Sequence, residues 1–311
     1  KSIDWTKTSV VRGDKNPTPF SYMTADFCPP NVPCHTTYTN SEAHSIIEKN
    51  KNRSPMFTGD INGTGPRYCP SIEDKIHRFM DRDSHLLFLE PEWKNSDQIY
   101  LNGFSTSLPE SVQLKALQQI SAFRNVRFLR PGYAIEYDFF PPSQLKNTLE
   151  TKKIEGLFFA GQVNGTSGYE EAAAQGLLAG INASKKVGDQ DQVALTRDSS
   201  YIGVMIDDLI TKDTLEPYRM FTSRAEHRLI LRTSNTCERL LSTSKKFGLH
   251  EKRHLEYLSS IIDSKNKTLK SLSASIKPGE LKTTPPLNQP TPASSVLKRV
   301  EVSIFDLPSI Y

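Results

Sequence analysis

The chain has 311 residues, of which 36% are hydrophobic and 24% charged, with a formal net charge of +4. This length is typical of about two domains. The mild positive charge is compatible with an RNA partner but does not by itself indicate one. No apolar run approaches 18 residues, so no transmembrane helix is predicted. Cys28, Cys34, Cys69 and Cys237 lack the Cys-x-x-Cys spacing of metal or redox sites, which favours a reducing compartment, and no disulfide framework is implied.

The first 52 residues are polar and rich in turns. Prolines at positions 17, 19, 29, 30 and 33 predict an extended backbone until a short helix at 41–50. The chain begins with Lys1 and not with methionine, in the middle of what resembles a folded domain. We therefore expect it to be a C-terminal piece of a longer protein.

Residues 53–188 alternate between strand and helix signals. Strands are predicted at 85–89 and 126–129. A helix is predicted at 110–123, because Pro109 suits its first turn and apolar residues recur near one face: Val112, Ala116, Leu117, Ile120 and Phe123. Alternating elements of this kind indicate an α/β domain.

The most informative stretch runs from residue 156 to residue 171. A short apolar run at 157–160 predicts a strand of a parallel sheet, buried on both faces. Gly161, Gly165 and Gly168 then allow a sharp turn and close approach of a ligand. A helix is predicted from about 169 to 185, whose first N–H groups would face the turn.

This glycine-rich turn has two interpretations. A lone turn of this kind is most often an ordinary strand-to-helix connection. Gly176 and Gly180, however, lie four apart on the predicted helix, where each glycine costs about 1 kcal/mol. We expect another backbone to approach that face closely, and this favours a cofactor cradle.

After residue 189 the pattern becomes helical. Helices are predicted at 200–209, 219–232 and 251–272, followed by a flexible or extended linker at 277–295. Arg224, Arg228 and Arg232 would share one helical face, which is most often solvated. The adjacent acids Asp207 and Asp208 would point to different sides of a helix, so no metal site is predicted.

Three stretches together resemble one known family. They are Gly63–Lys75, Gly161–Ala183 and Glu216–Arg228, in that order along the chain. They resemble the glucose-inhibited-division family, flavoproteins that modify the wobble uridine of tRNA and are known in mitochondria as the tRNA optimisation protein. The resemblance covers most of residues 33–235. One departure is the absence of the family's Gly-x-Gly-x-x-Gly fingerprint, which Gly63-Thr64-Gly65 does not replace.

The resemblance implies a fold class and a division of the chain. We expect part of a flavin-binding α/β domain, glutathione-reductase-like and of Rossmann type, followed by an α-helical domain. Residues 1–52 would be the tail of an insertion or nicotinamide-binding domain, and 53–190 the C-terminal half of the FAD-binding domain. Residues 191–311 would form a truncated helical domain that binds tRNA or a partner. The last segment, 296–310, resembles the start of a further helical segment.

The resemblance also implies roles for individual residues. The flavin side of the cofactor site would comprise Gly161, Gln162, Asn164, Gly165, Thr166, Ser167, Gly168 and Glu170. Gly65, Arg67 and Tyr68 belong to the part that meets the nicotinamide dinucleotide. Arg219, Arg224, Arg228 and Arg232 would contact tRNA phosphates in a bidentate way.

Cys69 is the predicted catalytic residue. Taken alone, a single cysteine is most often a small buried hydrophobe. Arg67 and Lys75 lie nearby in sequence and would favour the thiolate. In the resembling family, the cysteine of this segment is proposed to add to C6 of the uridine, which makes C5 nucleophilic. Cys34 is interpreted as structural, while Cys28 and Cys237 give no signal beyond burial.

The acids Glu73 and Asp74 have two interpretations, helix-start capping and general acid/base catalysis, of which capping is preferred.

The activity implied by the resemblance is formation of 5-carboxymethylaminomethyl-type uridine at position 34 of tRNA. The intact enzyme would use FAD, NADH, methylene-tetrahydrofolate and an amine, with a GTPase partner, as a homodimer. Lys/Asn/Ser-rich insertions favour a mitochondrial location. Two alternatives remain open: a folate- and flavin-dependent tRNA uridine methyltransferase, and a non-catalytic module that binds RNA or a partner. The isolated chain is expected to bind FAD weakly and to be inactive.

Overall fold

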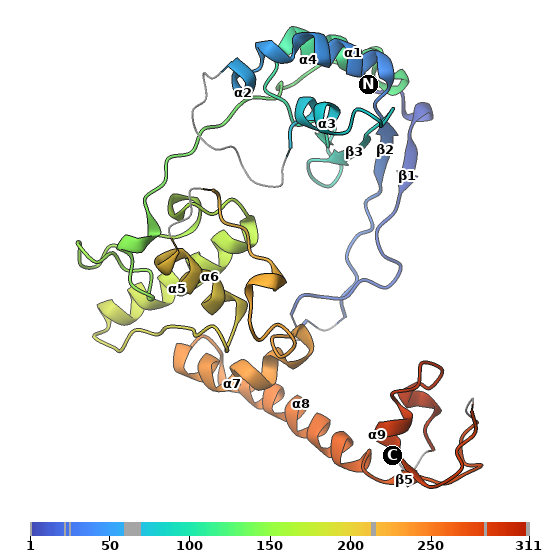
Figure 1. Cartoon of the computed structure of the whole chain (residues 1–311), viewed down its shortest axis with the longest axis vertical. Coiled ribbons are helices and arrows are strands. Elements are labelled where there is room, and N and C mark those ends of the chain that lie inside the picture. Colours follow the sequence, from blue (N-terminus) through green and yellow to red (C-terminus); the bar gives the residue numbers. More distant parts are fainter. Residues whose placement is uncertain are drawn as a thin grey trace. The chain divides into compact units, whose positions relative to one another are not determined.

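A computed structural model describes residues 2–21, 23–24, 26–58, 70–212, 216–282 and 285–308. The chain divides into two compact units (Figure 1). The first comprises residues 1–194 and 204–221, and the second residues 195–203 and 222–311. The division at residues 52 and 190 stays a prediction.

The first unit contains a four-stranded sheet in which every pairing is antiparallel. Its strands are β1 (Ser9–Val11), β2 (Cys34–Tyr38), β3 (Leu86–Pro91) and β4 (Ile99–Asn102), in that spatial order. Leu89 is the partner of His35 on β2 and of Leu101 on β4. The predicted strand at 85–89 is therefore confirmed, and Leu87 and Leu89 point into the core because alternate side chains share a face.

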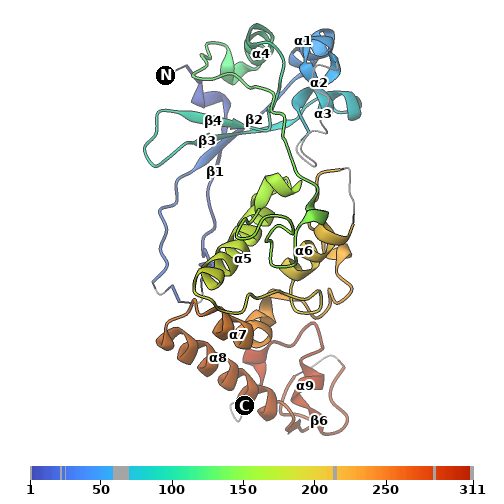
Figure 2. The same ribbon diagram turned by 90° about the vertical axis from the view of Figure 1, so that its left-hand side faces the viewer.

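Helices cover one face of this sheet (Figure 2). They are α1 (Ser41–Asn50), α3 (Ile72–Arg78) and α4 (Glu110–Leu117), with the short α2 (Pro55–Thr58) beside α1. The helix predicted at 41–50 is confirmed, and Asn40 caps it by accepting a hydrogen bond from the Ala43 N–H at 2.9 Å. The shared core includes Ala43, Ile47, Ile72, Ile76, Leu87, Leu89, Val112, Ala116, Leu117 and Phe123.

Two predictions in this region need correction. The helix predicted at 110–123 ends at Leu117, and a 3-10 turn, Ser121–Phe123, follows. Its five apolar residues are all buried, as predicted. Residues 126–129 are not a strand, because the Val126 N–H bonds to the Phe123 carbonyl in a turn and the Val126 and Phe128 side chains pack against the core.

The predicted strand at 157–160 does not join a parallel sheet. Its backbone is extended but forms only an isolated antiparallel bridge, between Glu150 and Phe158, with two further backbone bonds beside it. Its side chains are half-buried. Among the described strands, every pairing is antiparallel, so a strand covered on both faces is not observed here.

The helix predicted at 169–185 is α5 (Tyr169–Val187). Gly176 and Gly180 lie on its exposed side, and a Cβ atom added at either would meet nothing within 4 Å. The expected close approach of a second backbone is therefore wrong within the described part of the chain.

Residues 131–140 form an extended segment that leads to the glycine-rich turn. Among the described residues, none donates or accepts a backbone hydrogen bond with residues 133–139. Tyr133, Ile135 and Tyr137 alternate along this segment and are exposed. The Phe140 N–H bonds to the Val163 carbonyl at 2.8 Å, which ties the end of the segment to the turn.

The helix α6 (Tyr201–Thr211) belongs to both units, and it confirms the helix predicted at 200–209. In the second unit, α7 (Thr236–Phe247) packs on α8 (Lys252–Ser271). The helix α8 confirms the prediction at 251–272, whereas α7 was not predicted.

The helix predicted at 219–232 is wrong. A 3-10 turn at Thr222–Arg224 and further turns occupy this stretch. Only Ala225 and Leu231 of it are buried, six positions apart, which is not a spacing that one helical face provides. Leu229 and Ile230 are exposed. This stretch therefore lacks the apolar face through which an amphipathic helix packs on its neighbours.

The segment predicted as a free linker is partly folded. The strands β5 (Ser275–Ile276) and β6 (Thr291–Pro292) pair across it, and α9 (Ala293–Val296) follows. A small core joins them, consisting of Leu272, Ile276, Leu287, Ala293, Val296 and Val302. Because Leu287 is buried, the segment contributes to this core.

Candidate functional site at the glycine-rich turn

The turn after residue 160 depends on glycine at two positions. Gly161 and Gly165 have φ angles of +84° and +75°, a region that residues with a Cβ atom rarely adopt. A 3-10 turn, Gly161–Asn164, lies between them. An added Cβ would lie 3.3 Å from the Ala172 Cβ at Gly161, and 3.4 Å from the Phe139 Cδ2 at Gly165. The sequence therefore selects glycine here for both conformation and space.

One buried amide holds the turn together. Gln175, on α5, is fully buried, and its Oε1 accepts hydrogen bonds from the Gly161 N–H at 3.0 Å and the Asn164 Nδ2 at 2.8 Å. Its Nε2 donates to the Thr166 hydroxyl at 3.0 Å and to the Glu171 carbonyl at 3.2 Å. Sequence analysis missed this role. The only available signal was a polar residue on the inner face of a helix.

The start of the stretch Glu216–Arg228 packs against the glycine-rich turn. Tyr218 forms a parallel bridge with Thr166, and its N–H donates to the Gly165 carbonyl at 2.8 Å. The Tyr218 hydroxyl donates to the buried Asp208 carboxylate at 3.0 Å, and Lys212 pairs with the same carboxylate at 2.6 Å. Asp208 is thereby a structural anchor. The structure thus brings two distant motifs of the sequence into one site.

Glu171 extends this junction at the first turn of α5. Its Oε1 accepts a hydrogen bond from the Met220 N–H at 2.8 Å and lies 3.5 Å from the Arg219 Nε. A carboxylate in the first turn of a helix suits the positive end of the helix dipole. Arg219, predicted to contact tRNA, therefore lies at the cofactor cradle.

The predicted flavin-side residues differ in exposure. Asn164, Thr166 and Gly168 are buried, whereas Gln162 and Glu170 are exposed. Three buried polar atoms at the cradle lack a hydrogen-bond partner within the described residues: Asn164 Oδ1, Ser167 Oγ and Glu171 Oε2. A buried polar group without a partner is rare in native proteins, and a ligand, an ion or a water molecule can satisfy it.

These features test whether the cradle suits a flavin cofactor. Glycines remove side chains from the turn, the α5 N-terminus directs N–H groups toward it, and unpartnered hydroxyl and amide groups line it. A flavin offers hydrogen-bond donors and acceptors along the edge of its ring and gains negative charge on reduction. The residues present therefore fit this group.

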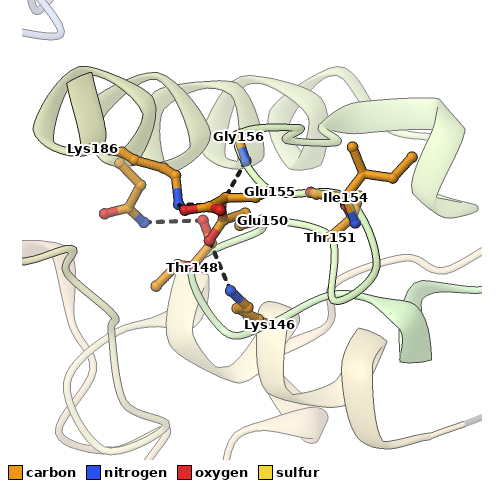
Figure 3. A network of polar contacts seen from close by, with 9 residues as sticks. Lys146, Thr148, Glu150, Thr151, Ile154, Glu155, Gly156 and Lys186 are labelled. Carbon is orange, nitrogen blue, oxygen red and sulfur yellow. Dashed lines mark hydrogen bonds and ion pairs between the residues drawn. The ribbon is translucent and has the colours of Figure 1, made fainter.

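A second buried carboxylate lies at the other end of α5 (Figure 3). Lys186 contacts Glu150 at 2.7 Å, Lys146 contacts it at 3.0 Å, and the Gly156 N–H donates to it at 2.8 Å. Lys186, with these neighbours, lowers the pKa of Glu150 to about 2. Both oxygens of Glu150 are thereby engaged, and this cluster is structural.

Near α3, the capping residue is Ser71, whose hydroxyl accepts from the Asp74 N–H at 3.2 Å. Asp74 pairs with Arg78 at 2.8 Å. Glu73 is fully buried and accepts from the Ser107 N–H at 3.2 Å, so it joins α3 to the loop before α4. These contacts give both acids structural roles. The predicted site residues Cys69, Gly65, Arg67 and Tyr68 lie outside the described residues.

The remaining cysteines are free thiols. Cys34 lies half-buried in β2, as a structural role requires, and Cys237 is half-buried in α7. Cys28 is exposed, which corrects the expectation of burial. Across the described ranges, no group of three or more His, Cys, Asp or Glu side chains is arranged to hold a metal ion.

A histidine pair, half-buried His44 and buried His85, lies where β2 leads into α1. His44 and His85 have ring centroids 5.2 Å apart, and the Thr39 hydroxyl lies 2.6 Å from the His44 Nε2. Burial lowers the pKa of both histidines. This arrangement favours neutral rings inside the first unit.

The row of arginines loses its predicted geometry. Without a helix at 219–232, Arg224, Arg228 and Arg232 do not recur on one helical face. Arg228 and Arg232 are exposed and Arg224 is half-buried. In the same unit, Arg197 donates to the Arg224 carbonyl at 3.1 Å and pairs with Glu226 at 2.6 Å.

Comparison with known proteins decides the family. The family model described as "Glucose inhibited division protein A" matches residues 1–191. The chain belongs to this family. A relative from Christiangramia forsetii, "tRNA uridine 5-carboxymethylaminomethyl modification enzyme MnmG", is 50% identical over 320 residues, covering 99% of this chain and 51% of the relative. The protein of the same name from Flavobacterium psychrophilum is 51% identical over 317 residues, again covering 99% and 51%.

The solved structure of Aquifex aeolicus GidA in its form II crystal matches with a TM-score of 0.82 and 41% sequence identity. The match covers 98% of this chain and 49% of the solved one. It confirms the predicted fold class, part of a flavin-type α/β domain followed by a helical region. The chain spans about half the length of the relatives it matches. None of the helices in the described residues is long and apolar enough to cross a membrane.

Proposed function

We propose that this chain is part of an FAD-dependent enzyme that builds 5-carboxymethylaminomethyl-type uridine at the wobble position of tRNA. Membership of the glucose inhibited division protein A family supports the proposal. So do relatives at about half identity that are named as tRNA uridine 5-carboxymethylaminomethyl modification enzymes. The observation that carries it is the cradle, where three buried polar atoms lack partners within the described residues around a glycine-rich turn.

In this proposal the cradle holds the flavin end of FAD, which supplies two-electron redox chemistry when bound. Gly161, Gly165 and Gly168 let the turn pack closely against Ala172, Phe139 and the Glu171–Arg219 pair. The hydroxyl of Ser167 and the amide oxygen of Asn164 are available to it. Gln175 holds the turn in place through its four hydrogen bonds, so the cradle is shaped before the cofactor enters.

Cys69 is the proposed nucleophile toward the uridine ring. A thiolate is a far better nucleophile than a hydroxyl at neutral pH. Gly65, Arg67 and Tyr68, in the same stretch, are the proposed contacts of the NADH that reduces the flavin. Methylene-tetrahydrofolate is the proposed one-carbon donor.

The proposed partners are tRNA and a GTPase, with the intact protein as a homodimer. Arg224, Arg228 and Arg232 stay candidates for phosphate contacts, supported by their charge and by the exposure of Arg228 and Arg232. The bacterial relatives named above do not support the mitochondrial location predicted from the insertions. Import of the full-length protein into isolated mitochondria tests that location.

The alternative of a folate-dependent tRNA uridine methyltransferase finds no support in the names of the relatives above. The alternative of a non-catalytic binding module predicts a full-length protein without flavin. Absorbance of the purified full-length protein between 350 and 500 nm, where oxidised flavins absorb, separates this module from a flavoprotein.

The decisive experiment is Cys69→Ser in the full-length protein. We expect loss of the modified wobble uridine in tRNA from cells that carry the variant, with flavin content near that of wild type. Cys34→Ser is the matched control, because Cys34 is a half-buried strand residue. Wild-type levels of the modified nucleoside in the Cys69→Ser strain would exclude Cys69 as the nucleophile.

A further inference from the structure

Two charged side chains cover Gly168, the residue that immediately precedes α5. A Cβ atom added there would lie 1.8 Å from the Glu171 Oε2 and 2.0 Å from the Arg219 Nη1. Real Cβ atoms do not approach other atoms this closely. A methyl group at position 168 would therefore displace the ends of both side chains, because a carboxylate and a guanidinium occupy the space beside the first turn of the helix.

The backbone fixes the position of this pair. The Thr166–Tyr218 bridge brings residue 219 alongside the helix start, and the Met220 N–H donates to the Glu171 Oε1 at 2.8 Å. Glu171 itself is buried. The Arg219 guanidinium is therefore held at the cradle from two sides, by its neighbours along the chain and by the carboxylate.

The charge at this point favours an electron-rich ligand. A helix N-terminus carries a partial positive charge, and Arg219 adds a full one beside it. The Glu171 Oε2 has no hydrogen-bond partner within the described residues. A cation and an acceptor thus lie together at the edge of the cradle.

We propose that Arg219 contacts the flavin ring and stabilises the negative charge that the ring gains on reduction, and that Glu171 positions Arg219 for this contact. The inference rests on the proposed FAD site. A hydride leaves the C–H bond of the reduced nicotinamide dinucleotide with two electrons. The oxidised nicotinamide remains, and the flavin ring gains one negative charge. A nearby guanidinium favours that product over the oxidised ring. This assignment replaces the predicted phosphate contact of Arg219.

The test is the midpoint potential of bound FAD in the full-length protein, measured from its absorbance during a reductive titration. In Arg219→Gln the ratio of reduced to oxidised FAD at a given potential is expected to fall about tenfold, so that the midpoint potential falls by about 30 mV for a two-electron couple. Glu171→Gln releases Arg219 but also removes a negative charge, which acts in the opposite direction, so it is expected to lower the potential by less. Arg219→Lys keeps the charge and is expected to retain most of the wild-type potential.

The matched control is Arg228→Gln, an exposed arginine of the second unit. An unchanged potential in Arg219→Gln, or an equal shift in Arg228→Gln, would overturn the inference. If Arg219→Gln binds too little FAD for the measurement, Arg219→Lys is used instead. Because lysine keeps the charge, a potential in Arg219→Lys as low as that of Glu171→Gln would contradict the role of charge. A wild-type protein without FAD would refute the proposed site, a result distinct from a flavoprotein whose potential ignores Arg219.

Discussion

Two buried glutamates lie near the two ends of α5, and they differ in how many of their carboxylate oxygens have hydrogen-bond partners. At the C-terminal end, Glu150 has both carboxylate oxygens engaged by Lys146, Lys186 and the Gly156 N–H. At the N-terminal end, Glu171 uses only Oε1, while its Oε2 lacks a hydrogen-bond partner among the described residues. Both glutamates are almost fully buried. Burial alone therefore does not distinguish a structural carboxylate from one at a ligand site.

What distinguishes them is the state of the surrounding hydrogen bonds. A complete network stabilises the fold and leaves nothing for a ligand to satisfy. An incomplete network beside glycines is stable only if a ligand or an alternative partner compensates for the unpaired atoms. Variants at the two ends should accordingly separate ligand affinity from fold stability.

The largest effect on FAD affinity is expected at Gly168. Gly168→Ala places a methyl group where Glu171 and Arg219 now lie, so the pair must move away from the cradle. We expect FAD affinity of the full-length protein to fall by about tenfold or more, equivalent to about 1.4 kcal/mol. Titration of the apoprotein with FAD measures this loss.

Gly176→Ala is the matched control on the same helix. Its added methyl group meets nothing within 4 Å, and alanine in a helix interior is more stable than glycine by about 0.5–1 kcal/mol. This variant is expected to unfold at a higher temperature with unchanged FAD affinity. Equal losses of affinity in both variants would remove the contrast between the two positions.

A separate effect, on stability, is expected at Gln175. Gln175→Leu removes the partner of the Gly161 N–H and of the Thr166 hydroxyl, both in buried surroundings. Leaving buried polar groups unpaired lowers the free energy of unfolding by about 3 kcal/mol in total. Denaturant unfolding measures the change.

Gln190→Leu serves as the control, because Gln190 is exposed and its substitution should change stability by about 0.5 kcal/mol at most. A Gln175→Leu variant as stable as this control would mean that the turn does not depend on the buried amide.

The last effect concerns Glu150 and is read from the pH dependence of stability. Its folded-state pKa, about 2, lies below the ordinary value of 4.5, so its ionised form stabilises the folded protein above pH 4.5. That contribution is lost as the pH falls from about 4.5 to about 2. Glu150→Gln should therefore show a flatter decline in unfolding free energy across this window, as measured by denaturant unfolding at several pH values.

Glu155→Gln is the control for Glu150, because Glu155 contacts the same Lys186 but its side chain is 84% exposed. It should decline with pH as wild type does. Identical pH profiles for wild type and Glu150→Gln would contradict the structural role assigned to the Glu150 ion-pair cluster.

Local signals in the sequence predicted much of the fold. The helices at 41–50 and 169–185 were correct because each has a defined start, Asn40 as a side-chain cap and Gly168 as the end of a turn. The short strands β1 and β4 were missed, since three or four residues in polar surroundings carry little periodicity. Arginines spaced every four residues mimicked a helix at 219–232 where no apolar face supports one.

The site was predicted in part. Glycines at 161 and 165 marked the turn because their positive φ angles constrain residue type locally. The meeting of Tyr218 with Thr166 could not be predicted, because it joins residues 52 positions apart through backbone atoms that every residue shares. Gln175 was missed for a related reason. A glutamine on a helix has the same sequence pattern whether it faces solvent or a loop.

The extended segment 131–140 also determines how this chain should behave in concentrated solution. Its backbone groups between 133 and 139 are unpaired within the described structure, and Tyr133, Ile135 and Tyr137 are exposed along it. A strand of alternating apolar residues with open edges is a template for addition of another strand, including the same strand of a neighbouring molecule. Purified alone, the chain is therefore expected to self-associate as its concentration rises, and charged substitutions at Tyr133 or Ile135 are the changes that should keep it monomeric.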